Sequence, residues 1–481
     1  MLSKNSVLKV KIESVSGDGQ GVARVDGQVV FVPYTAVNDE VEIVIIKVTK
    51  TYAVGKVQKL LTPSSCRVDI DCEAFLKCGG CAFRHLTLDE EQRIKTQSVK
   101  DAMRRIGGID VEVKDAILTP YTAYRNKAQL PVAEDEKGLK CGFFAPYSHR
   151  IVDKTLDCLA TPEIFSDIAR MTLDFMRKER ISGYCEEKHT GLVRHLYMRI
   201  NKEGRVMLCL VVNGKALVSR ETEKRFADYI TSAFPEIVSV FVNENSRVTN
   251  AVLGDSFRLI FGQDYLEDEL LGIRLRMSPD SFFQVNREGA ETVYKTAFSL
   301  LEGKSFENVY DLYCGVGSIG LSLFSEIKNG NLNVSAERLF GIEIVEKAAE
   351  WARRNAEANG IEDCDFAAAD SSDITEMDWF DKYPPSLVIL DPPRKGTTER
   401  LLKYLSDKGV SDILYISCNP TTLARDMSYL YSLGYSASFV VPVNLFPRTS
   451  HVETVVLLSR EKADDYVRIS VHTKDLKTSM N

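Results

Sequence analysis

The chain has 481 residues, which is too long for one hydrophobic core, so we expect two to four domains. With 44% hydrophobic and 27% charged residues it has the composition of a soluble globular protein, and its apolar runs are shorter than the eighteen or so residues that cross a bilayer. The N-terminus lacks an apolar signal core, so we expect a cytoplasmic protein that does not contact membranes. A net charge of −7 argues against a protein that coats nucleic acid indiscriminately, but it leaves room for a local basic groove.

Residues 1–60 are predicted to form a small β-domain. Apolar and polar residues alternate in short runs, and glycines at 17, 19, 21 and 27 supply the turns. The runs are Val7–Ile12, Gln28–Val32, Glu40–Lys47 and Tyr52–Leu60. This pattern is typical of a five-stranded OB-like barrel, a fold that often binds oligonucleotides. A purely structural β-domain fits the spacing equally well.

A cysteine-rich loop follows the barrel. Cys72, Cys78 and Cys81 lie within ten residues, and Gly79-Gly80 lets the backbone wrap a bound object. The chain has eleven cysteines, and in a reducing compartment such cysteines are better read as ligands, nucleophiles or core residues than as disulfides. Three thiolates need a fourth ligand for Zn²⁺ or for a four-iron cluster, and the spacing fits both. The candidates for the fourth ligand are Cys66, Cys141 and Cys158. Unrelated small core residues are the alternative interpretation.

Residues 61–275 are predicted to form an α+β domain around a mostly antiparallel sheet, with the cysteine loop near its start. Residues 88–106 have helical periodicity and many Lys and Arg side chains. Further on, strand and helix patterns alternate irregularly. The predicted strands are Val206–Val212, Ile237–Asn243 and Phe257–Phe261, and the predicted helices are Pro162–Arg177 and Thr222–Ser232.

Residues 276–460 are predicted to be a doubly wound Rossmann-like domain. A buried strand, Phe306–Tyr310, leads into the glycine-rich stretch Asp311–Gly320 and then into a helical pattern near Leu321. Taken alone, this stretch is as often a simple turn. Glu343 ends the next predicted strand, where an acidic residue can accept a ribose hydroxyl.

Two further motifs follow predicted strands. Asp391-Pro392-Pro393-Arg394 comes after Leu387–Leu390, and Ser417-Cys418-Asn419-Pro420 comes after Ile413–Ile416. Because ligands bind at the carboxyl ends of such strands, we expect the motifs to face one crevice. Cys418 should be partly exposed near helix-initiating N–H groups, which lower a thiol pKa; a buried structural cysteine is the alternative.

Near the end of the domain, Glu453 in His451-Val452-Glu453-Thr454 should direct a carboxylate into this crevice as a general base, although taken alone it is more often a surface glutamate. Cys314 is predicted to pack beneath the glycine turn. Residues 461–481 form an appended tail with one short strand predicted at Tyr466–His472.

Five motifs in this order resemble the RNA 5-methyluridine methyltransferases, and more narrowly their iron–sulfur branch that modifies 23S ribosomal RNA. They are Phe283–Asn286, Asp311–Gly315, Asp391–Arg394, Ser417–Pro420 and His451–Thr454. The resemblance covers almost the whole chain: the first sixty residues resemble a TRAM domain, and Cys72, Cys78 and Cys81 match the ligands of that branch's 4Fe–4S cluster. It implies that Cys158 is the fourth ligand and that Cys66 has no part in the cluster.

The resemblance further implies that the chain binds S-adenosylmethionine. By motif, the residues that contact this cofactor are Gln284, Tyr313, Glu343 and Asp391, with Asp370 near the adenine. One departure concerns Glu343, because the stretch from Gly320 to Glu343 is longer than the usual ~20 residues. An inserted loop at 329–333 accounts for the difference.

The same resemblance implies a covalent mechanism on RNA. The Cys418 thiolate adds to C6 of uracil, C5 takes the methyl group, and Glu453 removes the C5 proton. The uridine must be turned out of its RNA, and Phe282 and Phe283 are candidate stacking surfaces, although packing is the expected role of at least one of them. We expect the protein to act as a monomer.

Three alternatives remain open at this point. The first is the same chemistry on transfer RNA or on another ribosomal uridine. The second is an RNA-binding iron–sulfur protein without catalysis, which the presence of both Cys418 and Glu453 disfavours. The third is a radical S-adenosylmethionine enzyme, which is disfavoured because the cysteine spacing is not C-x3-C-x2-C and lies outside the cofactor domain.

Overall fold

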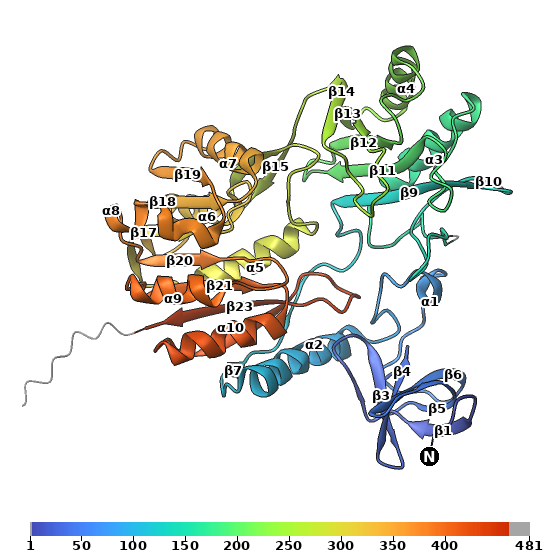
Figure 1. Ribbon diagram of the computed structural model, residues 1–481, viewed down its shortest axis with the longest axis horizontal. Helices are drawn as coiled ribbons and strands as arrows, with labels where there is room; N and C mark the ends of the chain where they lie inside the picture. The colour runs from blue at the N-terminus through green and yellow to red at the C-terminus, as the bar shows by residue number, and fades with distance from the viewer. Residues whose placement is uncertain (1, 153, 461–481) are drawn as a thin grey trace, which may run out of the picture.

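The computed structural model describes residues 2–152 and 154–460. Its N-terminal part is a strongly curved, barrel-like six-stranded sheet with the strand order β1-β5-β6-β4-β3-β2 (Figure 1). The strands are β1 (Val7–Lys11), β2 (Ser14–Val15), β3 (Gln20–Val25), β4 (Gln28–Pro33), β5 (Glu40–Val48) and β6 (Tyr52–Thr62). In the first part of β5 every second residue is buried, namely Val41, Ile43 and Ile45, as the alternating pattern predicts. Two of the six strands, β2 and β3, are not among the four predicted runs.

A connecting segment runs from the barrel to the C-terminal domain. It contains α1 (Phe75–Cys78), α2 (Leu88–Ala102), the π-helical turn η1 (Met103–Gly107) and two short strands, β7 (Glu112–Val113) and β8 (Ile117–Leu118). Both strands pair with β22 (Phe439–Asn444) of the C-terminal sheet. Residues 61–275, predicted as one central domain, therefore do not form a single domain, because residues 88–118 pack with the C-terminal domain.

The central sheet has the order β10-β9-β11-β12-β13-β14, and only β12 and β13 run parallel. Its strands are β9 (Lys127–Asp135), β10 (Gly138–Cys141), β11 (Val193–Ile200), β12 (Val206–Val212), β13 (Ile237–Glu244) and β14 (Ser256–Gly262). The helices α3 (Glu163–Lys178) and α4 (Arg220–Ala233) pack on one face together with alternate β12 residues such as Leu208. The intervening residues, such as Cys209, pack on the opposite face against the hairpin of β15 (Leu266–Leu270) and β16 (Ile273–Met277). The uninterrupted apolar run of β12 reflects this burial on both faces.

The C-terminal sheet has the order β19-β18-β17-β20-β21-β23-β22-β7. Its parallel strands are β17 (Ser305–Asp311), β18 (Ser335–Glu343), β19 (Cys364–Ala368), β20 (Leu387–Leu390) and β21 (Asp412–Ser417), and β23 (Glu453–Ser459) runs antiparallel between β21 and β22. Helices cover both faces, which confirms the doubly wound prediction (Figure 1). They are α5 (Arg287–Ser299), α6 (Ser318–Lys328), α7 (Glu346–Ala358), α8 (Trp379–Lys382), α9 (Glu399–Asp407) and α10 (Pro420–Ser432), with the 3₁₀ turn η2 (Ser371–Glu376).

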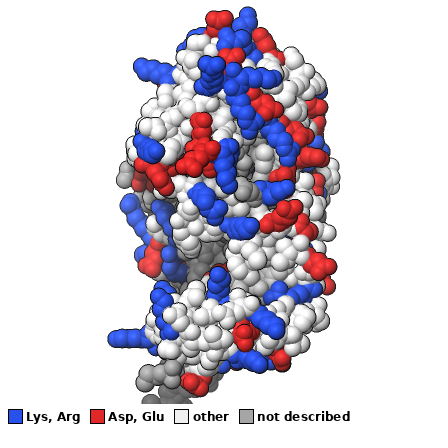
Figure 2. All heavy atoms as spheres, turned by 90° about the vertical axis from the view of Figure 1, so that its right-hand side faces the viewer, with Lys and Arg blue, Asp and Glu red and all other residues white. Residues whose placement is uncertain are grey.

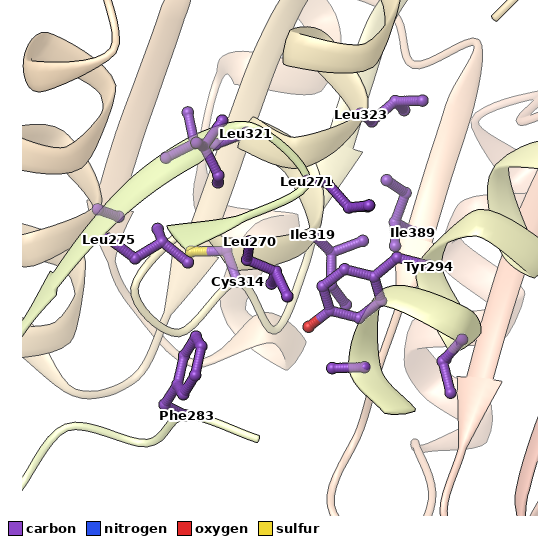
Figure 3. Close-up of a cluster of buried hydrophobic side chains, with 14 of the residues drawn as sticks. Leu270, Leu271, Leu275, Phe283, Tyr294, Cys314, Ile319, Leu321, Leu323 and Ile389 are labelled. Atoms are coloured by element: carbon purple, nitrogen blue, oxygen red, sulfur yellow. The ribbon is translucent and has the colours of Figure 1, made fainter. Parts of the chain in front are cut away.

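One hydrophobic core joins the central hairpin to this domain. Leu270, Leu271 and Leu275 of the β15–β16 hairpin lie beside Tyr294 of α5 and the apolar side chains of α6, as Figure 3 shows. The described part of the chain contains no helix with the length and apolar character of a membrane span. The strand predicted at Tyr466–His472 lies outside the described residues.

A buried charged cluster fixes the segment 444–448 to α2. Lys95 lies 3.1 Å from Glu91, donates a 2.5 Å hydrogen bond to Asn444 Oδ1, and donates another to the carbonyl of Phe446. The Glu91 carboxylate accepts hydrogen bonds of 2.8 Å from both the Asn444 amide group and the Arg448 backbone N–H. Burial lowers the pKa of Lys95 to about 8, although the neighbouring Glu91 opposes this shift. The cluster places the residues just before β23 at a fixed position over α2.

Candidate active site and cofactor crevice

The glycine turn between β17 and α6 forms the first wall of the crevice. Gly315 and Gly317 have φ angles of 55° and 84°, a left-handed backbone that favours glycine. The Gly315 N–H donates to Glu343 Oε2 over 3.1 Å, and the Val345 N–H donates to the other oxygen over 2.9 Å. Despite the inserted loop, Glu343 thus lies against the turn. Cys314 is buried close to Gly341 below it, as predicted.

Two acidic residues at the carboxyl ends of β17 and β20 face a crowded, poorly hydrated environment. Asp311 Oδ2 accepts a hydrogen bond from the Gly320 N–H over 3.1 Å, whereas its Oδ1 is buried without a hydrogen-bond partner among the described residues. Burial raises the pKa of Asp311 to about 7, and burial together with the Asp311 charge raises the pKa of Asp391 to about 7. Within residues 2–152 and 154–460, neither carboxyl forms an ion pair. These carboxyl groups suit a positively charged ligand whose hydroxyl groups donate hydrogen bonds, such as S-adenosylmethionine.

The remaining predicted cofactor residues lie at the same end of the sheet. The Tyr313 hydroxyl lies 3.0 Å from Thr397 Oγ1, and Gln284 is half-buried, with its backbone carbonyl accepting from Asn126 Nδ2 over 2.9 Å. Asp370 follows β19 and is exposed. Its carboxylate accepts a 2.8 Å hydrogen bond from the Ser372 N–H at the start of η2, and Ser372 lowers its pKa. Asp370 therefore already caps a helical turn.

Cys418 lies in the turn between β21 and α10. Asn419 caps α10, and its amide group donates to the carbonyl of Arg394 over 3.1 Å, which ties the Asp391–Arg394 motif to the cysteine turn. Cys418 lines a cavity of about 260 Å³ together with Arg394 and His451, whose side chains approach to 3.2 Å. Its far wall comes from Gly17 and Asp18 of the barrel and Ser98 of α2. Sequence reasoning missed these wall residues because they lie more than 300 positions away from Cys418.

The charges around Cys418 contradict the expectation of a lowered thiol pKa. Burial, followed by the carboxyls of Glu453 and Asp391, raises the pKa of Cys418 to about 11, and the guanidinium of Arg394 offsets only part of this effect. Glu453, the first residue of β23, is buried, and burial together with Asp391 raises its pKa to about 8. The helix N-terminus was expected to dominate, but two nearby acids and the loss of solvent outweigh it.

The two phenylalanines predicted as stacking surfaces differ in their exposure to solvent. Phe283 is 3% exposed and belongs to the hydrophobic core (Figure 3), so it has the packing role that was expected for at least one of the two rings. Phe282 is 65% exposed and is available for contact with a ligand.

A second cavity, of about 320 Å³, contains the cysteine loop. Cys72, Cys78, Cys81 and Cys158 all line it, whereas Cys66 and Cys141 do not. Burial raises the pKa of Cys81 to about 11, and the Cys158 and Cys72 charges add to this shift. Among the described residues, no group of three or more His, Cys, Asp or Glu side chains is placed to hold a single metal ion. The structure thus brings the four predicted ligands to one cavity without forming a compact single-ion site.

The doubly wound sheet, the glycine turn with Glu343 and the enclosed acids define a nucleotide-cofactor-binding α/β enzyme with a cysteine in its crevice. Residues 205–461 match the tRNA (Uracil-5-)-methyltransferase family, and residues 3–58 match the TRAM domain. The chain belongs to this family of S-adenosylmethionine-dependent RNA methyltransferases.

Curated relatives and a solved structure agree with this assignment. An uncharacterized RNA methyltransferase of Clostridium tetani is 37% identical over 461 residues, covering 95% of this chain and 97% of the relative. One from Halalkalibacterium halodurans is 36% identical over 460 residues, with 95% and 98% covered. The Pyrococcus abyssi tRNA (uracil-54, C5)-methyltransferase, solved with S-adenosyl-L-homocysteine, is 27% identical with a TM-score of 0.73, covering 94% of this chain and 99% of that one.

The charges in the crevice predict how Cys418 reacts with iodoacetamide in the free enzyme. Since only the thiolate reacts, the alkylation rate should rise about tenfold per pH unit from pH 7 towards pH 10. Glu453→Gln removes a negative charge beside the sulfur, so its rate at pH 9 should exceed that of the wild type, whereas Arg394→Met should slow it. The rate is followed by mass spectrometry of the Cys418 peptide, with buried Cys314 as the unreactive control. Equal rates in all three proteins would contradict this electrostatic account.

Proposed function

We propose that the protein transfers a methyl group from S-adenosylmethionine to C5 of a specific uridine in 23S ribosomal RNA, through a covalent adduct between Cys418 and C6 of the base. The observation that carries the proposal is the pairing of β21 with β23, in which Ser417 lies opposite Thr454 and the Thr454 hydroxyl donates to the Ser417 carbonyl over 2.9 Å, so that Cys418 and Glu453 are neighbours at the ends of adjacent strands.

The chemistry requires both groups. C5 of uracil is a weak carbon nucleophile, and addition of the Cys418 sulfur to C6 turns the ring into an enolate with electron density at C5. C5 then takes the methyl group, leaving S-adenosylhomocysteine. Glu453 removes the remaining C5 proton, and the bond between sulfur and C6 breaks to release the product. A pKa of about 8 suits Glu453 to this task, because a base works best when its pKa lies near the working pH.

The surface around the crevice supports a folded RNA as substrate. Figure 2 shows a hollow in the face that carries the N-terminal barrel below and the central domain above, with Lys and Arg side chains around it. A uridine held in an RNA helix cannot reach Cys418, so it must be turned out of its stack at a cost of a few kcal/mol. Barrel residues Gly17 and Asp18 line the Cys418 cavity, which gives the barrel a direct place in binding the displaced nucleotide.

The covalent step predicts opposite behaviour for two variants. Glu453→Gln should form the adduct but fail to release it, so a protein–RNA species should survive denaturing gel electrophoresis, with turnover lowered about 10²–10⁴-fold. Cys418→Ala should give neither the adduct nor methylation. The gel is run with and without S-adenosylmethionine, with Cys364→Ala as the control for loss of an unrelated thiol. Methylation by Cys418→Ala at the native rate would exclude the mechanism.

The identity of the RNA is tested separately. The cysteine motif supports 23S ribosomal RNA, since it resembles the iron–sulfur branch, whereas the similarity to the Pyrococcus abyssi enzyme favours transfer RNA as a second candidate. Mass-spectrometric mapping of 5-methyluridine in both RNAs, from cells with and without the gene, should show a ribosomal position that loses its mark. A mark lost from transfer RNA alone would reject the ribosomal target.

The proposal includes a 4Fe–4S cluster held by Cys72, Cys78, Cys81 and Cys158. These four cysteines line one cavity, and their thiolates would hold the cluster there. Methyl transfer needs no electron, and we assign the cluster a structural role that also positions the RNA. Ala82 and Phe83, next to Cys81, both donate backbone hydrogen bonds to the carbonyl of Arg448, at 2.8 and 3.0 Å, five residues before Glu453.

Replacing one ligand tests this role. Cys78→Ser should lose the iron and the visible absorbance, lower the temperature of unfolding, and reduce methylation, because the loop that holds the Arg448 carbonyl is no longer cross-linked. Iron content, thermal unfolding and methylation are compared with those of Cys66→Ser, whose side chain does not line the cavity. Normal folding and normal methylation of Cys78→Ser would rule the role out.

A further inference from the structure

The loop between Cys141 and Val152 carries an unusual aromatic residue at its tip. Tyr147 has a relative exposure of 110%, which is more than for any other large apolar or aromatic side chain among the described residues. Its φ angle of 57° lies in the left-handed region that aromatic residues rarely adopt. The conformation costs free energy, and a fully exposed ring recovers none of it by burial. Tyr147 therefore contributes nothing evident to the stability of the free protein.

The loop beneath this ring is well ordered by its own contacts. Phe144 and Ile151 form an antiparallel β-bridge. The Ala145 N–H donates to the Arg150 carbonyl over 2.9 Å, and the Ser148 N–H donates to the Ala145 carbonyl over 3.1 Å. The Phe144 ring meets the His149 ring edge-on at 5.4 Å. The tip is thus a short hairpin that holds the Tyr147 ring out in solvent.

The hairpin stands directly on the cysteine cavity. Ala145 and Val152 pack with Ala74 against Cys72 and Cys78. A Cβ atom at Gly79 would lie 2.4 Å from Pro146 Cγ, so only glycine allows this close approach. The same cavity is lined by Thr449, two residues before His451 of the catalytic pocket. The hairpin that carries Tyr147 therefore packs against the same cavity as Thr449, which lies close in sequence to the residues of the Cys418 cavity.

The surroundings of Tyr147 are polar and carry charges of both signs. Ser148, His149 and Arg150 follow it and are exposed, but they share a cavity with the carboxylates of Glu134, Asp135, Glu186 and Glu187. Lys77 and Lys154 are exposed on the other side, on segments that line or flank the cysteine cavity. A protein partner is recognised mainly through a larger, well-packed apolar patch, and a single exposed ring does not provide one. An aromatic face with cations on one side is instead what unpaired RNA bases and their phosphates require.

We propose that Tyr147 is a stacking platform for a second, unpaired base of the RNA substrate, distinct from the target uridine, with Lys77 and Lys154 meeting the adjoining phosphates. The proposal rests on the proposed function in that the RNA is the one the enzyme methylates. Because stacking acts on binding rather than on the reacting atoms, the contribution belongs to KM and Kd and leaves kcat unchanged.

The experiment compares Tyr147→Gly, Tyr147→Phe and Val218→Gly in the full-length protein. Val218 is the matched control, because it is 64% exposed with a φ angle of 66° on a different loop, before α4. The probe is an unmodified 23S ribosomal RNA transcript, with a transfer RNA transcript in parallel. Kd, KM, kcat and the temperature of unfolding are measured for each protein.

Tyr147→Gly should weaken Kd and raise KM roughly 5- to 150-fold, the range for loss of one stacked base. Its kcat at saturating RNA and its thermal stability should match the wild type, since glycine accepts the left-handed backbone. Tyr147→Phe should retain wild-type affinity, and Val218→Gly should change nothing. RNA substituted with 5-iodouridine should crosslink to the Tyr147 peptide.

Three results would overturn the proposal. They are an unchanged Kd for Tyr147→Gly, an equal loss in Tyr147→Phe, or a loss of affinity that follows a lowered unfolding temperature. A wild-type protein that methylates neither RNA would instead refute the proposed function, so the two failures are distinguishable.

Discussion

The fold depends on a buried charge pair between α2 and the segment that precedes β23. Glu91 and Lys95 are both shielded from water, and taking two such ions out of solvent costs several kcal/mol each unless their remaining hydrogen bonds are satisfied. From a segment about 350 residues farther along the chain, Asn444 and Phe446 supply the bonds of Lys95, and Asn444 and Arg448 supply those of Glu91 Oε1. Glu91 Oε2 has no hydrogen-bond partner among the described residues, and the Arg448 guanidinium lies 3.5 Å from it. Removing any partner leaves a charge or a polar group uncompensated, so the arrangement tolerates little displacement. Segment 444–448 is thereby held in a single position.

That segment connects the two cavities of the molecule. Its Arg448 carbonyl accepts the backbone hydrogen bonds of Ala82 and Phe83 beside the cysteine loop. A few residues later come Thr449 in the wall of the cysteine cavity, His451 in the wall of the Cys418 cavity, and Glu453 at the start of β23. The Glu453 carboxylate and the cysteine loop are therefore anchored to the same stretch of backbone. Under the proposed function, this is a physical reason for a structural metal group in the cysteine loop to matter to a reaction that needs no metal.

Much of the fold could be predicted because neighbouring residues in the sequence specify its helices and strands. The period-two alternation of β5, the continuous apolar run of β12 and the strand–glycine–helix order at Asp311 each specify an element from neighbouring residues. The pairing of β7 and β8 with β22 could not be predicted in this way, because two-residue strands carry no periodicity and their partner is more than 300 residues distant. The same holds for the contribution of Gly17, Asp18 and Ser98 to the catalytic cavity.

The motifs place the candidate residues at the carboxyl ends of strands, but they give no information on the electrostatics of the crevice. A motif shows that Cys418 precedes a helix, and it says nothing about how many carboxyls converge on the sulfur after folding. Asp311, Asp391 and Glu453 come from three different strands, and each raises the pKa of at least one other acidic group in the crevice. With pKa values raised in this way, the Cys418 thiol is protonated and Glu453 is only partly ionised at neutral pH. A cationic cofactor would reduce the repulsion among these acids. Because the same acids raise the pKa of the Cys418 thiol, cofactor binding and ionisation of the thiol are coupled. The raised pKa therefore lowers the reactivity of the half-buried Cys418 towards electrophiles in the free enzyme.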